Sequence, residues 1–187
     1  MKEDEFVSVA LEAARQVLAA PLSIERGASL LYQVTVDNRL ALSVDPQNPK
    51  RGQSAFQTDL CVFETVCTGT RIPRVVLEFK PRLTTHDVLT YSSKARKHKQ
   101  VYPYLRYGLV IAHLDKLPGR FFTHNEALDF GFAAGLYSHS HLYKFFSKLL
   151  ASEVECSRQL ERIVYGTEQV HLFRTGVEAK TGDGKVV

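Results

Sequence analysis

The sequence predicts a single α+β (α/β) domain with a mixed β-sheet, and three observations support this fold class. A segment with helical periodicity opens the chain, several β-rich segments follow between residues 30 and 80, and a helical segment then leads to a short, nearly all-apolar strand. The 187 residues, 44% of them hydrophobic and 24% charged, suffice to bury one core and have the balance of an ordinary globular domain.

The first predicted elements are a helix and a β-hairpin. Residues 4–20 carry apolar side chains at helical spacing, and Pro21 ends the helix. Residues 30–44 contain two β-rich runs joined by Asp37-Asn38, a pair that tolerates left-handed backbone and is typical of hairpin turns. A polar loop at 45–54 follows the hairpin.

Two further strands are predicted at 55–66 and 74–80, with a turn between them. Because side chains alternate along a strand, the second strand has a purely apolar face and a face that carries two charges. The first face consists of Val75, Leu77 and Phe79, and the second of Val76, Glu78 and Lys80.

The second half of the chain is predicted to be mostly helical. A helix over 84–101 has Thr84 or Thr85 as its N-cap, and a strand at 106–114 is apolar enough to be buried on both faces. Helices are then expected at about 124–137 and 140–164.

These elements divide the chain into three parts. Residues 1–117 form the core, in the order helix, mixed sheet, helix, strand, and residues 118–175 form a helical extension packed on it. Residues 176–187 contain no core-forming pattern, and we expect them to be disordered.

Composition excludes several classes of protein and favours few. No apolar run is long enough to span a bilayer, the acidic N-terminus is unlike a leader peptide, and the three cysteines lack disulfide or zinc spacing, so we expect a cytoplasmic protein without a membrane partner. No P-loop or dinucleotide fingerprint is present, so no nucleotide cofactor is expected. The net charge of +4 is only a mild bias toward polyanions, but the segment 94–99 is densely basic.

The strongest chemical signal combines Asp59, Glu78 and Lys80. The interval between Asp59 and Glu78 fits two antiparallel strands and a turn, so the two carboxylates can approach each other across the ladder. Adjacent carboxylates repel unless a cation lies between them, and Mg²⁺ prefers one or two carboxylates with carbonyl, water and phosphate oxygens. Lys80 points to the same side as Glu78 and would stabilise the charge of a phosphate.

This arrangement resembles the PD-(D/E)XK nuclease superfamily, which includes restriction endonucleases and RecB-type exonucleases. The resemblance rests on Asp59, preceded by Thr58 in place of the usual proline, and on Glu78-x-Lys80 in the next strand, followed by a helix and a buried strand. Gln100 to Tyr104 is similar to the Q-x-x-x-Y motif of RecB-type members. The resemblance implies a restriction-endonuclease-like core and metal-dependent hydrolysis of DNA.

The resemblance also implies roles for individual residues. Asp59, Glu78 and the backbone carbonyl of Phe79 would bind Mg²⁺, for which Mn²⁺ can substitute, while Lys80 and Gln100 would act in catalysis. Members of the superfamily often add an acid from the first helix. Glu12 is the candidate here, with Glu5 and Glu25 as competitors, and a solvated surface glutamate is the alternative for each.

A nucleic-acid interface is expected beside this site. Lys94, Arg96 and Lys97 would bind phosphates, and Tyr104 and Arg106 would bracket a strand. An ordinary solvated helix face, with tyrosines that cover the core, is the alternative. Restriction-type cutting of both strands would want a homodimer, for which the C-terminal helices are candidates.

The leading hypothesis is therefore a magnesium-dependent deoxyribonuclease, most simply an endonuclease of restriction, repair or mobile-element type. The alternative is a catalytically silent nucleic-acid-binding or protein-interaction module on the same fold. A third interpretation treats Glu78 and Lys80 as a surface ion pair in a protein unrelated to this superfamily, in which case Asp59 should lie far from Glu78.

Overall fold

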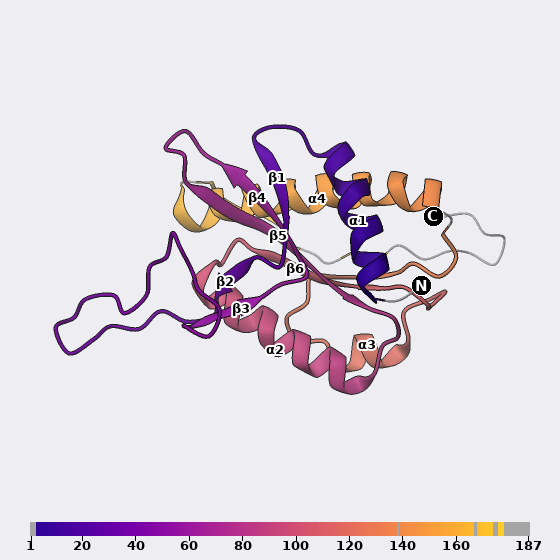
Figure 1. The fold of residues 1–187 in the computed structure, drawn as a ribbon, viewed down its shortest axis with the longest axis horizontal. Helices are drawn as coiled ribbons and strands as arrows, with labels where there is room; N and C mark the ends of the chain where they lie inside the picture. Colours follow the sequence, from indigo (N-terminus) through magenta and orange to yellow (C-terminus); the bar gives the residue numbers. More distant parts are fainter. Residues whose placement is uncertain (1–2, 138, 167, 174–175, 178–187) are drawn as a thin grey trace.

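A mixed five-stranded β-sheet forms the centre of the molecule, seen in a computed structural model that describes residues 3–137, 139–166, 168–173 and 176–177 (Figure 1). In spatial order its strands are β1 (Leu22–Arg26), β4 (Leu60–Thr65), β5 (Arg71–Lys80), β6 (Arg106–Ile111) and β7 (Phe130–Ala133). The first three are antiparallel neighbours, and β5, β6 and β7 run parallel. The α/β class and the mixed sheet expected from the sequence are thus confirmed.

Helices cover both faces of this sheet (Figure 1). One face is covered by α1 (Glu3–Val17) and α4 (His139–Tyr165), and the other by α2 (Thr85–Val101) and the short α3 (Gly119–His124). None of the helices in the described residues is both long and apolar enough to cross a membrane.

The alternation predicted along β5 is confirmed. Its apolar face packs with α1 and α4, and Val76 on the opposite face packs with α2. Thr84 is the N-cap of α2, because its side chain accepts from the Asp87 N–H while the Asp87 carboxylate accepts from the Thr84 N–H. The β6 strand is buried from Tyr107 onward, as its apolar composition predicts. Glu78 and α2 therefore lie on the same side of the sheet.

A separate two-stranded sheet and an extended arm replace the hairpin predicted at 30–44. β2 (Ser29–Leu31) pairs with β3 (Ala55–Gln57), and residues 33–53 between them project away from the sheet (Figure 1). The turn at Asp37 exists, and an isolated bridge with a few hydrogen bonds, such as that from the Ser43 N–H to the Thr35 carbonyl, joins the two sides of the arm without forming a strand ladder. Its apolar side chains are exposed and have no sheet to pack on, so the expected strands do not extend.

Two other predictions also need correction. The strand predicted at 55–66 is interrupted at Thr58-Asp59, which separates β3 from β4, and β1 was not anticipated. The helix predicted at 124–137 is wrong, because Asn125 accepts backbone N–H bonds from the next turn and the chain then adds β7 to the edge of β6. Residues 118–175 thus supply a strand to the central sheet, and 178–187 of the predicted disordered tail lie outside the described residues.

Candidate metal and phosphate site

Asp59 is positioned by the interruption between β3 and β4. The Thr58 N–H and hydroxyl both donate to the Ala28 carbonyl, which draws the chain away from β5 just before Asp59. The Asp59 carboxylate fills the resulting gap in the ladder and accepts from the Phe79 N–H, with a distance of 2.8 Å between Oδ2 and N. An aspartate therefore occupies the place that a strand residue would otherwise take beside β5.

The same geometry directs the Phe79 carbonyl toward the side of Asp59. The N–H and C=O of one strand residue point to the same neighbouring strand, and the next residue points to the opposite one. The Lys80 carbonyl accepts from Ala112 on the β6 side, so the backbone groups of Phe79 face the β4 side, where Asp59 lies. Asp59 and the Phe79 carbonyl thus face the same region beside Glu78.

Glu78 is buried on the α2 side of β5, with 2% of its surface exposed. Tyr107 Oη donates to Glu78 Oε1 at 2.5 Å. The pKa of Glu78 is raised to about 7, mainly by burial and then by the charge of Asp59 and a hydrogen bond with it, while Lys94 and Tyr107 oppose the rise. Such a carboxyl is uncommon in a core and is a candidate for function.

Two lysines near the carboxylates both lie close to the Tyr91 ring. Lys80 Nζ lies 5.5 Å and Lys94 Nζ 4.8 Å from the ring centroid. Burial raises the pKa of the Tyr91 hydroxyl to about 12, the charge of Glu78 adds to this rise, and Lys80 opposes it. Lys94 follows Tyr91 by one helical turn on α2, so the helix holds both side chains over the end of β5.

The residues present fit a divalent cation. Burial and the nearby Asp59 charge together disfavour the ionised form of Glu78, and a cation between the two carboxylates would offset both effects. Within the described residues, no group of three or more His, Cys, Asp or Glu side chains is arranged around a common point. A cation here would therefore take the two carboxylates, the Phe79 carbonyl and water, a set that suits Mg²⁺.

The surface ion pair of the third interpretation is contradicted by the structure. A surface ion pair between Glu78 and Lys80 would leave Asp59 distant, yet Asp59 touches the Phe79 backbone and perturbs Glu78. Glu78 is also buried rather than solvated.

The structure does not bring the Q-x-x-x-Y segment to this site. Gln100 is exposed near the end of α2, about 9 Å along the helix axis from Lys94 and on another side of the helix. The Tyr104 ring lies near Arg74 and Tyr165, about 13 Å along β5 from Glu78.

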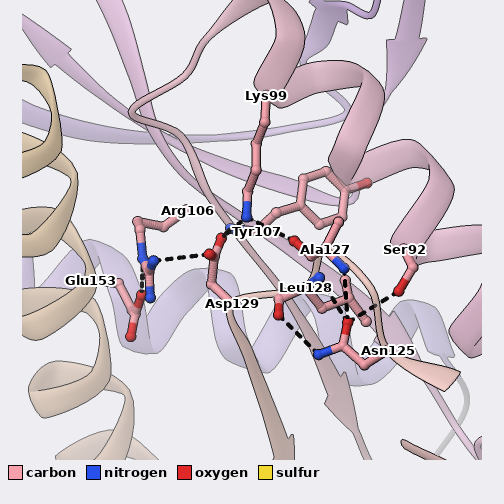
Figure 2. A network of polar contacts seen from close by, with 9 residues as sticks. All are labelled: Ser92, Lys99, Arg106, Tyr107, Asn125, Ala127, Leu128, Asp129 and Glu153. Carbon is pink, nitrogen blue, oxygen red and sulfur yellow. Dashed lines mark hydrogen bonds and ion pairs between the residues drawn. The ribbon is translucent and has the colours of Figure 1, made fainter. Parts of the chain in front are cut away.

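Arg106 is correctly placed in β6 but has a different role from the one expected (Figure 2). Its guanidinium forms ion pairs with Asp129 at 2.9 Å and Glu153 at 2.7 Å, and the side chain is 16% exposed. Asp129 also pairs with Lys99 at 2.6 Å and accepts from the Tyr107 N–H at 2.7 Å. This network joins α2, β6 and α4 and anchors the strand that presents Tyr107 to Glu78.

Most of the remaining predicted residues make contacts with groups other than the two carboxylates. Lys97 lies over the Tyr32 ring at 5.2 Å, near the site, and the exposed Arg96 pairs with Glu126 instead. Glu12 is exposed on α1, and its competitor Glu25 pairs with Arg71.

Tyr91 and Tyr107 belong to the site but were not predicted. Parallel pairing sets Tyr107 opposite Val76, one side-chain step from Glu78 on the same face, and no local pattern reveals that pairing. Tyr91 was recognisable only as a core position of α2. Searches of family models and of curated proteins found no match to this chain.

Proposed function

We propose that this protein is a metal-dependent nuclease that hydrolyses phosphodiester bonds in DNA. The observation that carries the proposal is the Asp59–Glu78 carboxylate pair, which lies at the end of β5 beside Lys80 and Lys94. Carboxylates that hold a divalent cation, next to lysines that receive a phosphate, are the combination that phosphodiester hydrolysis needs.

Each residue has a defined task in this proposal. Asp59 is held by the Phe79 N–H, and Glu78 by the Tyr107 hydroxyl, so both carboxylates are oriented before substrate arrives. When bound, Mg²⁺ or Mn²⁺ supplies Lewis-acid activation of the phosphate and of water. Lys80 stabilises the negative charge that grows on the phosphate oxygens during attack.

Glu78 links this chemistry to pH. With a pKa of about 7, its carboxyl keeps a proton in the absence of a cation and releases it when a cation binds. Cation binding, and hence hydrolysis, should therefore strengthen as pH rises through 7. Lys94 lowers the pKa of Glu78 and so favours the charged form.

The test is digestion of supercoiled, linear duplex and single-stranded DNA with Mg²⁺, Mn²⁺ or EDTA. Glu78→Gln and Lys80→Met should each reduce the rate by roughly 10²–10³-fold while the fold is retained by circular dichroism. Glu126→Gln and Lys144→Met are matched controls, because both residues are exposed. Glu126 lies in the loop between α3 and β7, and Lys144 lies on α4, both away from the carboxylates.

The outcome separates the alternatives. If folded Asp59→Ala and Lys80→Met variants cleave as fast as the parent, the nuclease assignment is wrong. DNA binding without metal-stimulated cleavage by the parent would instead support the catalytically silent module.

A further inference from the structure

A cavity of about 560 Å³ adjoins Asp59 on the side of the two-stranded sheet. Its volume lies in the range of roughly 300–1,000 Å³ that small-ligand sites occupy. It is partly open, and four segments line it, namely the end of β1, the last residues of the arm, the β2–β3 region up to Asp59, and α2. The lining residues are Arg26, Gly27, Tyr32, Arg51, Gly52, Ala55, Phe56, Gln57, Thr58, Asp59 and Lys94.

Two stacked aromatic rings form one wall of this cavity. Tyr32 directly follows β2 and Phe56 lies in the neighbouring β3, with ring centroids 4.1 Å apart and an interplanar angle of 19°. Both side chains are only partly buried, so the pair adjoins the cavity rather than the core. Exposed aromatic surface of this kind offers a stacking platform for a planar ligand.

The wall is held rigidly against α2 by His98. Its Nδ1–H donates to the Leu31 carbonyl at 2.8 Å, which fixes β2 to the helix. The His98 ring also packs edge-on against Phe56 and stacks on Tyr107, the residue that bonds Glu78. The aromatic wall and the carboxylate site are therefore parts of one packed unit.

Positive charge surrounds the rings. Lys97 lies 5.2 Å from the Tyr32 centroid and Lys94 5.9 Å from the Phe56 centroid. Arg51 donates to the neutral Gln57 amide, so this contact leaves its charge uncompensated. Arg26 is paired with Asp4 at 2.7 Å, so it contributes less. A ligand that has both an aromatic ring and phosphates matches this combination.

We infer that the cavity binds an unpaired nucleotide of the strand to be cleaved, so that the substrate is single-stranded DNA or DNA with an unpaired end. The inference rests on the proposed function, because Asp59 lines the cavity and the next phosphate of the strand would lie at the carboxylates. The base stacks on the Tyr32–Phe56 pair, and Lys94 and Arg51 bind its phosphates.

A duplex does not meet these requirements. Inside a duplex each base is covered on both faces by its neighbours and is paired at its edge, so entering the cavity would require unstacking and unpairing. For an unpaired nucleotide the free-energy cost of unstacking is smaller and no base pair has to be broken. The cavity therefore selects for unpaired bases without any need to read their identity.

The test measures binding in EDTA, where the proposed hydrolysis cannot proceed. Fluorescein-labelled single-stranded and duplex DNA of equal length are titrated with the full chain and followed by fluorescence anisotropy at one fixed salt concentration. The single strand should bind at least about tenfold more tightly, and Tyr32→Leu and Phe56→Leu should each weaken it by roughly 5- to 150-fold. A single strand with 2-aminopurine should report the stacking directly by quenching.

Phe122→Leu is the matched control, because Phe122 is an exposed aromatic residue on α3 outside the cavity. Tyr32→Leu and Phe56→Leu proteins that fold but bind the single strand like the parent would overturn the inference. Equal affinity of the parent for duplex and single strand, or no binding of either, would also overturn it. Metal-dependent cleavage and the Glu78→Gln variant test the nuclease proposal separately, so a failure of the binding inference can be told apart from a failure of the proposed function.

Discussion

Replacing Glu78 with glutamine should change the pH dependence of stability in a way that follows from burial. Burial, and then the charge of Asp59, raise the pKa of Glu78 from 4.5 to about 7. Between these values the folded state keeps a proton that the unfolded state has released, so the free energy of unfolding falls as pH rises. This contribution is complete below pH 4.5 and lost above pH 7. The difference of about 2.5 pH units corresponds to about 3 kcal/mol.

His98 opposes this trend in the parent protein. Burial lowers the pKa of His98 from 6.5 to about 4. Between these values the unfolded state binds a proton that the folded state lacks, so its contribution to stability is present above pH 6.5 and is lost as pH falls to 4. The two slopes have opposite signs over the same range and leave the parent nearly flat between about pH 4.5 and 6.5.

The difference between parent and variant isolates Glu78. Glu78→Gln retains an acceptor for the Tyr107 hydroxyl but cannot titrate. The variant should therefore gain about 3 kcal/mol relative to the parent as pH rises from 4.5 to 7.5. For a domain of this size the change in the Tm difference is about 6–12 °C.

The assay is urea unfolding, followed by circular dichroism in metal-free buffers at several pH values from 4.5 to 7.5. Glu126→Gln, which removes an exposed carboxylate, should differ from the parent by the same small amount throughout. A constant difference between Glu78→Gln and the parent would refute the reasoning, because it would mean that folding leaves the pKa of Glu78 unchanged.

Three further predictions concern the site and its support. Mg²⁺ should raise the Tm of the parent more at pH 7.5 than at pH 5.5, and Glu78→Gln should abolish this rise in Tm. An equal Tm shift of the parent at the two pH values would contradict the carboxylate site. Asp129→Ala removes the carboxylate that pairs with Lys99, one of the two that pair with Arg106, and the acceptor of the Tyr107 N–H, and should cost about 3–5 kcal/mol in urea unfolding, whereas Asp45→Ala in the exposed arm should cost little. Replacing 34–52 with Asn-Gly should change stability by less than about 1 kcal/mol, since the arm is exposed and its ends meet at the β2–β3 pair; a larger loss would mean that the arm packs on the core.

Periodicity predicted the elements that have a strong local pattern. The alternation of β5, the N-cap of α2 and the buried β6 all follow from side-chain spacing or capping chemistry within a few residues. β7 was not predicted, because a strand of four residues carries too little periodic signal. Its strand conformation depends instead on pairing with the edge of β6.

The approach of Asp59 to Glu78 was predictable because two antiparallel strands and a short turn fix it within one stretch of chain. The ion pairs of Arg106 were not predictable, since its partners Asp129 and Glu153 come from later segments that meet it only in the folded protein. An arginine next to a basic helix is equally compatible with phosphate binding and with internal ion pairs.

The sequence by itself determined that Glu78 and Lys80 lie on one face at the end of a strand, because strand periodicity is a local property, and that Asp59 can approach them across a short turn. The tertiary structure alone decided that Glu78 is buried, that Tyr107 bonds it and that an aromatic cavity opens beside Asp59. Burial and pKa depend on which distant segments surround a group, and those segments are brought together only by packing across the sheet.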